Sequence, residues 1–145
     1  MSIPFGAEIP FVNHLGFLLN KFEDGHSELV FAPKPEHLNS FAVTHGGALM
    51  TLLDVTMATA ARSAQKDMGV VTVEMKTMFM RPGQVEFGPL KALGHLIHRS
   101  TTLAFTEATV YNGKGEPCAH ATGTFKYVKR LPDALKKMNE QISTD

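Results

Sequence analysis

The stretch GGALMTLLDVTMATAA, residues 46–61, decides the fold, and Asp54 carries its only formal charge. Its larger apolar residues recur at helical spacing, at Leu49, Leu52, Leu53, Met57 and Ala60. The spacing predicts a helix from Gly46 to about Ser63, and the other positions are also small or apolar. A helix that is apolar nearly all round is buried on most sides. The stretch therefore predicts a central helix wrapped by a sheet, with a subunit interface on one flank.

Asp54 needs an explanation, because burying an unpaired charge costs many kcal/mol. The carboxylate is therefore expected to be desolvated, partnered or functional. The same stretch follows Thr44 and opens with His45-Gly46-Gly47, so Thr44 or His45 is placed to cap the helix. Free N–H groups at a helix start are good donors to a negatively charged oxygen. A carboxylate combined with such donors indicates a site.

Composition bounds the class of protein. The 145 residues are 43% apolar and 19% charged, which is typical of one globular domain over residues 1–145. The formal net charge is zero, so the basic surface typical of nucleic-acid binding is missing. The single cysteine, Cys118, excludes an internal disulfide and is expected to be inert, and no signal peptide or membrane span is visible. These features predict a soluble cytoplasmic protein.

The rest of the chain is dominated by strand patterns. Residues 15–22 and 27–32 read as a hairpin around Asp24-Gly25, and residues 71–79, 90–98, 103–111 and 118–128 read as four further strands. Asn112-Gly113-Lys114-Gly115 is a plausible turn between the last two, and residues 132–142 suggest a short polar helix. By strand alternation, Thr72 lies opposite Val71 and Val73, consistent with a site outside the main core. The order predicts an α+β fold with one helix packed on a curved antiparallel sheet.

These residues resemble the hotdog-fold acyl-CoA thioesterases, and the phenylacetate-degradation (PaaI-like) branch in particular. The resemblance covers about residues 12–128, which leaves a tail at 129–145. It rests on His45-Gly46-Gly47, on Asp54 nine positions after the histidine, and on Asn39 and Thr72. Two further segments look like those that hold coenzyme A. They are Phe79-Met80-Arg81-Pro82-Gly83 and Arg99-Ser100-Thr101-Thr102-Leu103-Ala104-Phe105.

The resemblance implies hydrolysis of a hydrophobic or aromatic acyl-CoA. Asp54 is then the nucleophile or general base, Asn39 orients the attacking water or the carbonyl, and Thr72 holds that same water. The Gly46 N–H is a suitable oxyanion donor, while His45 is more plausibly structural than catalytic. Substrate-binding residues are expected at Gly47 and in the two coenzyme A segments, namely Arg81, Pro82, Gly83, Arg99, Ser100 and Thr101. No metal and no cofactor besides the coenzyme A of the substrate is implied.

One distance predicts a shared site. Eight residues separate Gly46 from Asp54, which is ~12 Å along one helix, so both cannot touch one carbonyl. An antiparallel helix of a second chain brings its own Gly46 next to Asp54, and a two-fold dimer does this twice. We therefore expect a homodimer with composite sites, formed by Asp54 of one chain and Gly46 and Asn39 of the other. The resemblance further implies a homotetramer built as a dimer of dimers.

Other readings stay open at this stage. A hydratase or dehydratase of acyl thioesters uses a paired histidine and carboxylate, but His45 is expected to be committed to the helix start. A non-enzymatic acyl-CoA binder would not need Asp54, Asn39 and the Thr72 hydroxyl together. Each residue also has a purely structural reading, since Asn39 is common in turns, Thr72 in strands, and arginines on solvated surfaces.

Overall fold

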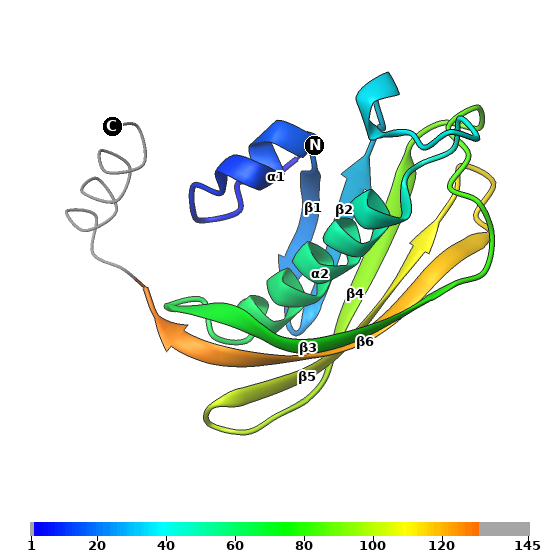
Figure 1. The fold of residues 1–145 in the computed structure, drawn as a ribbon. Helices are drawn as coiled ribbons and strands as arrows, with labels where there is room; N and C mark the ends of the chain where they lie inside the picture. Colours follow the sequence, from blue (N-terminus) through cyan, green and yellow to red (C-terminus); the bar gives the residue numbers. More distant parts are fainter. Residues whose placement is uncertain (1, 131–145) are drawn as a thin grey trace, which may run out of the picture.

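The computed structural model describes residues 2–130, and six strands and two α-helices lie within that range (Figure 1). The elements follow the chain in this order: α1 (Pro10–Leu15), β1 (Leu18–Glu23), β2 (His26–Phe31), the 3-10 turn η1 (Pro35–His37), α2 (Gly46–Ser63), β3 (Met68–Phe79), β4 (Leu90–Arg99), β5 (Leu103–Tyr111) and β6 (Pro117–Lys129). The α+β prediction is confirmed. The expected helix over residues 132–142 lies outside the described residues.

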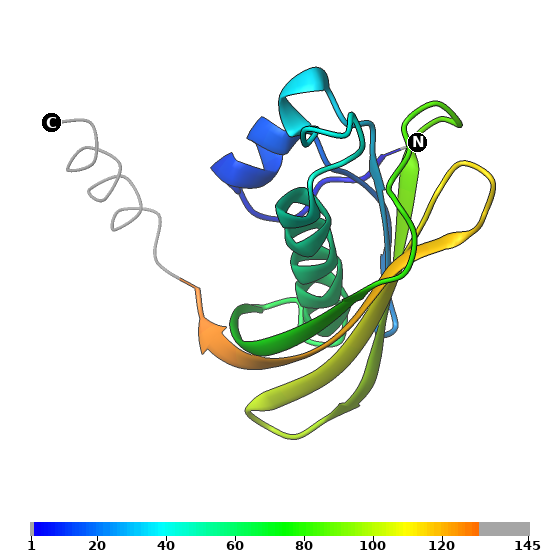
Figure 2. The same ribbon diagram turned by 45° about the vertical axis from the view of Figure 1, so that its right-hand side comes forward.

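The strands form one antiparallel sheet in the order β1-β2-β4-β5-β6-β3, and the sheet curves around α2 (Figures 1 and 2). The predicted hairpin is present, and Asp24 and Gly25 both adopt positive φ in its turn, at 50° and 78°. The turn at residues 112–115 also joins β5 and β6 as predicted. Because the sheet is open, β1 and β3 are its two edges. No helix among residues 2–130 is long and apolar enough to cross a bilayer.

Helix α2 has the predicted bounds and fills the concave side of the sheet. Leu52, Leu53 and Met57 are fully buried there together with Phe31 and Phe125 of the sheet. Complete burial of such a side chain contributes roughly 1.5–3 kcal/mol, so this packing fixes how α2 lies on the sheet. The side of α2 that faces β3 is more open, and Met50 there is 39% exposed.

The N-terminal boundary of the first strand was predicted wrongly. Residues 15–22 were expected to form one strand, but Leu15 ends helix α1 and β1 begins at Leu18. Pro10 occupies the first turn of α1, and Gly16 ends the helix in the left-handed conformation with φ 80°. Both residues are ordinary helix boundary signals. The helix has only six residues and is stabilised by burial of Val12 and Leu15. In the sequence, the alternating strand pattern that begins at Leu15 was therefore the stronger signal.

A bulge in β3 alters which residues face the helix. Thr72 pairs with Phe125 and Glu74 pairs with Thr124, so Val73 is an extra residue in the ladder. Val73 is 57% exposed, and Val71 is exposed as well, so these valines do not belong to the core that the alternation suggested. Beyond the bulge the inward positions change parity, because two residues oppose one on the partner strand.

Candidate active site

Asp54 and Thr72 form a direct pair between α2 and the edge strand β3. The Thr72 hydroxyl donates a hydrogen bond of 2.6 Å to Oδ1 of Asp54. This short bond orients the carboxylate and leaves its other oxygen for a second partner. Asp54 itself is only partly buried and Thr72 is exposed, so within one chain the carboxylate stays open to solvent on this side. The pair instead borders the open edge of the sheet.

A second group of predicted site residues lines a cleft at the N-terminal end of α2. The cleft has a volume of about 390 Å³, and its wall includes Asn39, Gly46, Phe79, Arg81, Pro82 and Gly83. The Gly46 N–H makes no hydrogen bond within residues 2–130. The Asn39 side-chain oxygen accepts from the N–H groups of Phe41 and Val43, at 2.9 and 3.3 Å. The loop therefore uses that oxygen and leaves the amide NH₂ of Asn39 to donate into the cleft.

His45 has the structural role that was expected. Its Nδ1 accepts a hydrogen bond of 2.8 Å from the Gly47 N–H and so caps α2. Thr44, the other candidate cap, instead donates its hydroxyl proton to the Gly83 carbonyl at 2.6 Å. Gly47 lines a different, smaller cleft beside Phe11. The structure therefore separates Gly47 from Gly46, although the two are adjacent in sequence.

The Arg81-Pro82-Gly83 segment supports the loop before α2. Gly83 is buried, and a Cβ there would lie 3.1 Å from the Thr44 side chain, so the loop packs closely on this glycine. Arg81 remains exposed, donates from Nη1 to the Pro117 carbonyl at 2.8 Å, and has Nε 3.9 Å from Glu116. A hydrogen bond from Asn112, and more weakly the charge of Arg81, lower the pKa of Glu116. The Arg81 guanidinium is thereby held beside the Gly46 cleft.

Arg99 lies at the opposite end of α2. Its Nη1 donates to the Ala64 carbonyl at 3.2 Å, and its guanidinium lies 5.1 Å from the ring centre of Tyr127. The 18 residues of α2, about 27 Å at 1.5 Å per residue, separate this end from Arg81. One chain therefore does not bring Arg81 and Arg99 to the same phosphate group.

The turn after Arg99 is shaped by its own hydroxyl. The Ser100 side-chain oxygen accepts from the N–H groups of Thr102 and Leu103, at 3.3 and 3.0 Å. Thr101 is exposed at the tip of the turn. Both residues lie in the turn next to Arg99, far from the Gly46 cleft. Cys118 is buried, and burial raises the pKa of its thiol, which agrees with the expectation that it is inert.

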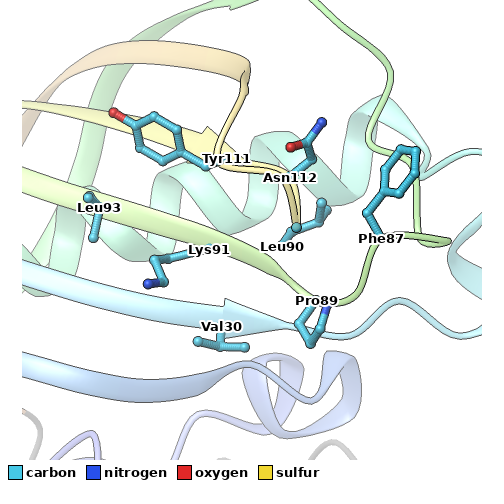
Figure 3. Close-up of a pocket in the computed structure, with 10 residues that line it drawn as sticks. Val30, Phe87, Pro89, Leu90, Lys91, Leu93, Tyr111 and Asn112 are labelled. Carbon is cyan, nitrogen blue, oxygen red and sulfur yellow. The ribbon is translucent and has the colours of Figure 1, made fainter.

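Sequence reasoning missed a groove of about 580 Å³ on the outer face of the sheet (Figure 3). Figure 3 shows Val30, Lys91, Leu93 and Tyr111 around it, with Phe87 and Pro89 at one end. The lining comes from three strands and two loops, so no local pattern in the sequence signals it. It lies on the side of the sheet away from α2 and is separate from the Asp54 pair and the Gly46 cleft.

Comparisons with known proteins agree with this architecture. Residues 41–119, which include Gly46, Asp54 and Thr72, match the thioesterase superfamily. A conserved protein of Pseudomonas aeruginosa has a similar structure, with TM-score 0.79, 27% identity and coverage of 85% of this chain and 97% of its own. The E. coli PaaI protein of the phenylacetic acid degradation operon shares the fold, with TM-score 0.75, 22% identity and coverage of 81% and 83%. A Streptococcus mutans protein bound to acetyl-CoA has TM-score 0.71, 25% identity and coverage of 80% and 91%.

The matched residues make up more than half of the chain. The family, the single long helix and the six-stranded antiparallel sheet agree with one another. The chain belongs to the thioesterase superfamily and is a thioester hydrolase with the hotdog fold.

Proposed function

We propose that the protein hydrolyses hydrophobic or aromatic acyl-CoA thioesters in a homodimer whose sites combine two chains. One observation carries the proposal. The Asp54–Thr72 pair and the unpaired Gly46 N–H lie on the same side of α2, but the eight residues between them span ~12 Å. A thioester carbonyl needs a base and an oxyanion donor within about 3 Å of its reacting atoms, so one chain is insufficient.

The open edge of the sheet offers a way to complete the site. Gly46, Met50 and Asp54 follow one another at four-residue spacing, so they share the side of α2 that borders β3. Antiparallel pairing of β3 with its copy places Gly46 of one chain toward Asp54 of the other when the two-fold axis lies near Met50. The matching point on β3 lies between Thr72, which contacts Asp54, and Phe79, which packs near Gly46. This register puts Met75 and Lys76 at the axis.

In this site Asp54 activates water. Its Oδ1 is held by Thr72, which leaves Oδ2 to take a proton from a water molecule as that water attacks the thioester carbonyl. The negative charge that develops on the carbonyl oxygen is stabilised by the Gly46 N–H of the other chain, at the positive end of its helix. The Asn39 amide of that chain orients the carbonyl. Collapse of the intermediate releases the free acid and the coenzyme A thiolate, which takes the proton from Asp54 and restores the carboxylate.

Two observations support the substrate class. Acetyl-CoA bound to the Streptococcus mutans protein supports a coenzyme A thioester as substrate. Phe79 is 50% exposed in the wall of the Gly46 cleft, and Met50, one turn of α2 after Gly46, is 39% exposed, which favours an apolar or aromatic acyl group. Arg81 is the proposed contact for the nucleotide phosphates at the cleft, and Arg99 is proposed to reach them from the chain that supplies Asp54.

A mixed dimer tests the shared site directly. Asp54→Ala and Asn39→Ala chains carrying different tags are each expected to be inactive in thiol-release assays with acyl-CoA. A heterodimer purified through both tags retains one intact site, with Asp54 and Asn39 supplied by different chains, and should recover about half of the wild-type rate per dimer. Purified heterodimers without activity, from parents that fold normally, would exclude the composite arrangement.

A cross-link tests the register. A cysteine replacing Lys76 should form a disulfide-linked dimer under mild oxidation, because the two copies of this position meet at the axis. Leu18→Cys, on the exposed edge strand β1, is the matched control and should stay monomeric in denaturing gels. Equal cross-linking at both edges, or cross-linking only at Leu18, would contradict pairing through β3.

We further propose that two such dimers associate into a tetramer. The outer face of the sheet exposes Leu93, Ile97 and Phe105, three large apolar side chains on adjacent strands. Exposed large apolar side chains on neighbouring strands favour a protein contact. Light scattering should give four times the chain mass, and a charged residue in place of Ile97 should halve it. A dimer mass for the wild-type protein would refute the second interface.

A further inference from the structure

Two arginines from distant parts of the chain meet at the C-terminal end of α2. Arg62 lies in the last turn of this helix and donates from Nη1 to the Phe5 carbonyl at 3.0 Å. Arg130 follows β6 directly and donates from Nη1 to the Gly6 carbonyl at 3.2 Å. These bonds attach the N-terminal segment to the body of the protein, and they use only one nitrogen of each guanidinium.

The other terminal nitrogens face the position that a side chain on Gly6 would occupy. Gly6 has φ 77° and no side chain, and the point where a Cβ would stand is 3.4 Å from Nη2 of Arg62 and 3.9 Å from Nη2 of Arg130. Arg62 is only 7% exposed, and its Nη2 is buried without a hydrogen-bond partner in the described part of the chain. Buried donors are nearly always paired, so this nitrogen calls for an acceptor.

The charges here are also uncompensated. Among residues 2–130, no carboxylate oxygen comes within 4.0 Å of either guanidinium. Burial, and to a smaller extent the neighbouring Arg130, lower the pKa of Arg62. The carbonyl groups at the end of α2 offset part of the positive charge, but they accept from other donors. An anion between the two arginines would satisfy both the free donor and the charge.

We propose that Arg62 and Arg130 form a binding site for a phosphate group beside Gly6. A guanidinium presents parallel N–H donors that match two oxygens of one phosphate, and two guanidiniums together suit its charge and its several oxygens. Two sources carry this chemistry, free inorganic phosphate and the phosphate monoester of coenzyme A. The site is about two turns of α2 beyond Asp54 and involves none of the proposed catalytic residues, so the inference does not depend on the proposed function.

Binding of inorganic phosphate tests the site. Calorimetry and thermal unfolding are measured at constant ionic strength, with chloride replacing phosphate in the reference. At ten times the Kd, phosphate should raise the wild-type Tm by about 5 °C. Arg130→Gln should weaken binding by about tenfold or more, because it removes one of the two guanidiniums. Arg130 is exposed, so this variant is expected to fold, and Arg130→Lys, which keeps the charge but not the fork, should lose less affinity.

Lys66→Gln is the matched control. The Lys66 ammonium lies 5.1 Å from the ring centre of Phe22, and Arg62 lies 5.5 Å from the same ring, so the same charge is removed nearby without touching the site beside Gly6. Its Kd for phosphate should stay within about twofold of wild type. Wild-type protein that does not bind phosphate, or equal losses in Arg130→Gln and Lys66→Gln, would overturn the site.

Coenzyme A and dephospho-coenzyme A identify the source. If coenzyme A is the source, it should bind more tightly than dephospho-coenzyme A, and Arg130→Gln should abolish that difference. If free phosphate is the source, both compounds should bind equally while inorganic phosphate still depends on Arg130. Either pattern supports a phosphate site, and loss of the Arg130 dependence for all three probes would contradict it.

Discussion

The Thr72 hydroxyl is the most direct point at which to test the active-site geometry. Thr72→Val keeps the shape of the side chain but removes the 2.6 Å hydrogen bond to Asp54. A hydrogen bond to a charged group contributes about 1.5–3 kcal/mol, and about 1.4 kcal/mol corresponds to a factor of ten. If Asp54 must be held by this bond in the transition state, kcat/KM for acyl-CoA hydrolysis should fall by about 10- to 150-fold. Thr72→Ser should stay within about threefold of wild type, since it keeps the hydroxyl group.

The sheet supplies a matched control for this substitution. Thr124 on β6 donates to the Glu74 carboxylate at the same distance, 2.6 Å, but at an exposed site on the outer face. Thr124→Val therefore removes an equivalent bond and should leave kcat/KM unchanged. Rates are followed by thiol release, with circular dichroism to verify folding. Wild-type activity in Thr72→Val, or equal losses in both valine variants, would refute the assigned role of the Asp54–Thr72 pair.

Three further outcomes are expected. Asp54→Asn should lower kcat by about 10²–10⁴ without loss of Tm, because it removes the proposed base and retains the side-chain shape. Gly94→Ala should lower Tm by about 3–10 °C in thermal unfolding, since its Cβ would stand 2.7 Å from the Thr56 carbonyl and overpacking costs about 1–3 kcal/mol; an unchanged Tm would contradict close packing of α2 there. The pKa of Glu116 is lowered in the fold, so its stabilising contribution is present at neutral pH and is lost as pH falls through that lowered value. The Tm difference between wild type and Glu116→Gln should accordingly shrink below about pH 4, and a constant difference would argue against the Asn112 bond.

The helix and the first hairpin could be predicted because their sequence signals are local and strong. The spacing and length of the apolar stretch predict helix α2, and the Asp24-Gly25 turn predicts the first hairpin. Helix α1 was missed because its few residues owe their conformation to packing against the core. The extra residue at Val73 was also invisible, since an inserted ladder residue leaves an alternating sequence looking regular.

The site was predicted in its components and less well in its arrangement. The resemblance assigned Asp54 and Thr72 to one site, with Thr72 holding the water, whereas in the structure the Thr72 hydroxyl bonds to Asp54 itself. The sequence did not show that Arg81 and Arg99 of one chain lie at opposite ends of α2, because this depends on which ends of the strands lie together. The ten residues of β4 lie between the two segments and span about 33 Å, a separation that follows from strand geometry once the sheet order is known.

The extra residue at Val73 allows the curvature of β3 to change without a change in which side chains face the helix. Two neighbouring outward residues, Val73 and Glu74, face one partner, so a chain lacking Val73 would still point Thr72 and Met75 toward the helix. Only the bend and the added twist of the strand would disappear. Such a one-residue deletion would keep Asp54, Thr72 and the other proposed catalytic groups, and it would straighten the edge strand β3, along which two copies are proposed to pair. Strand curvature would thereby become a variable that can be altered independently of chemical content.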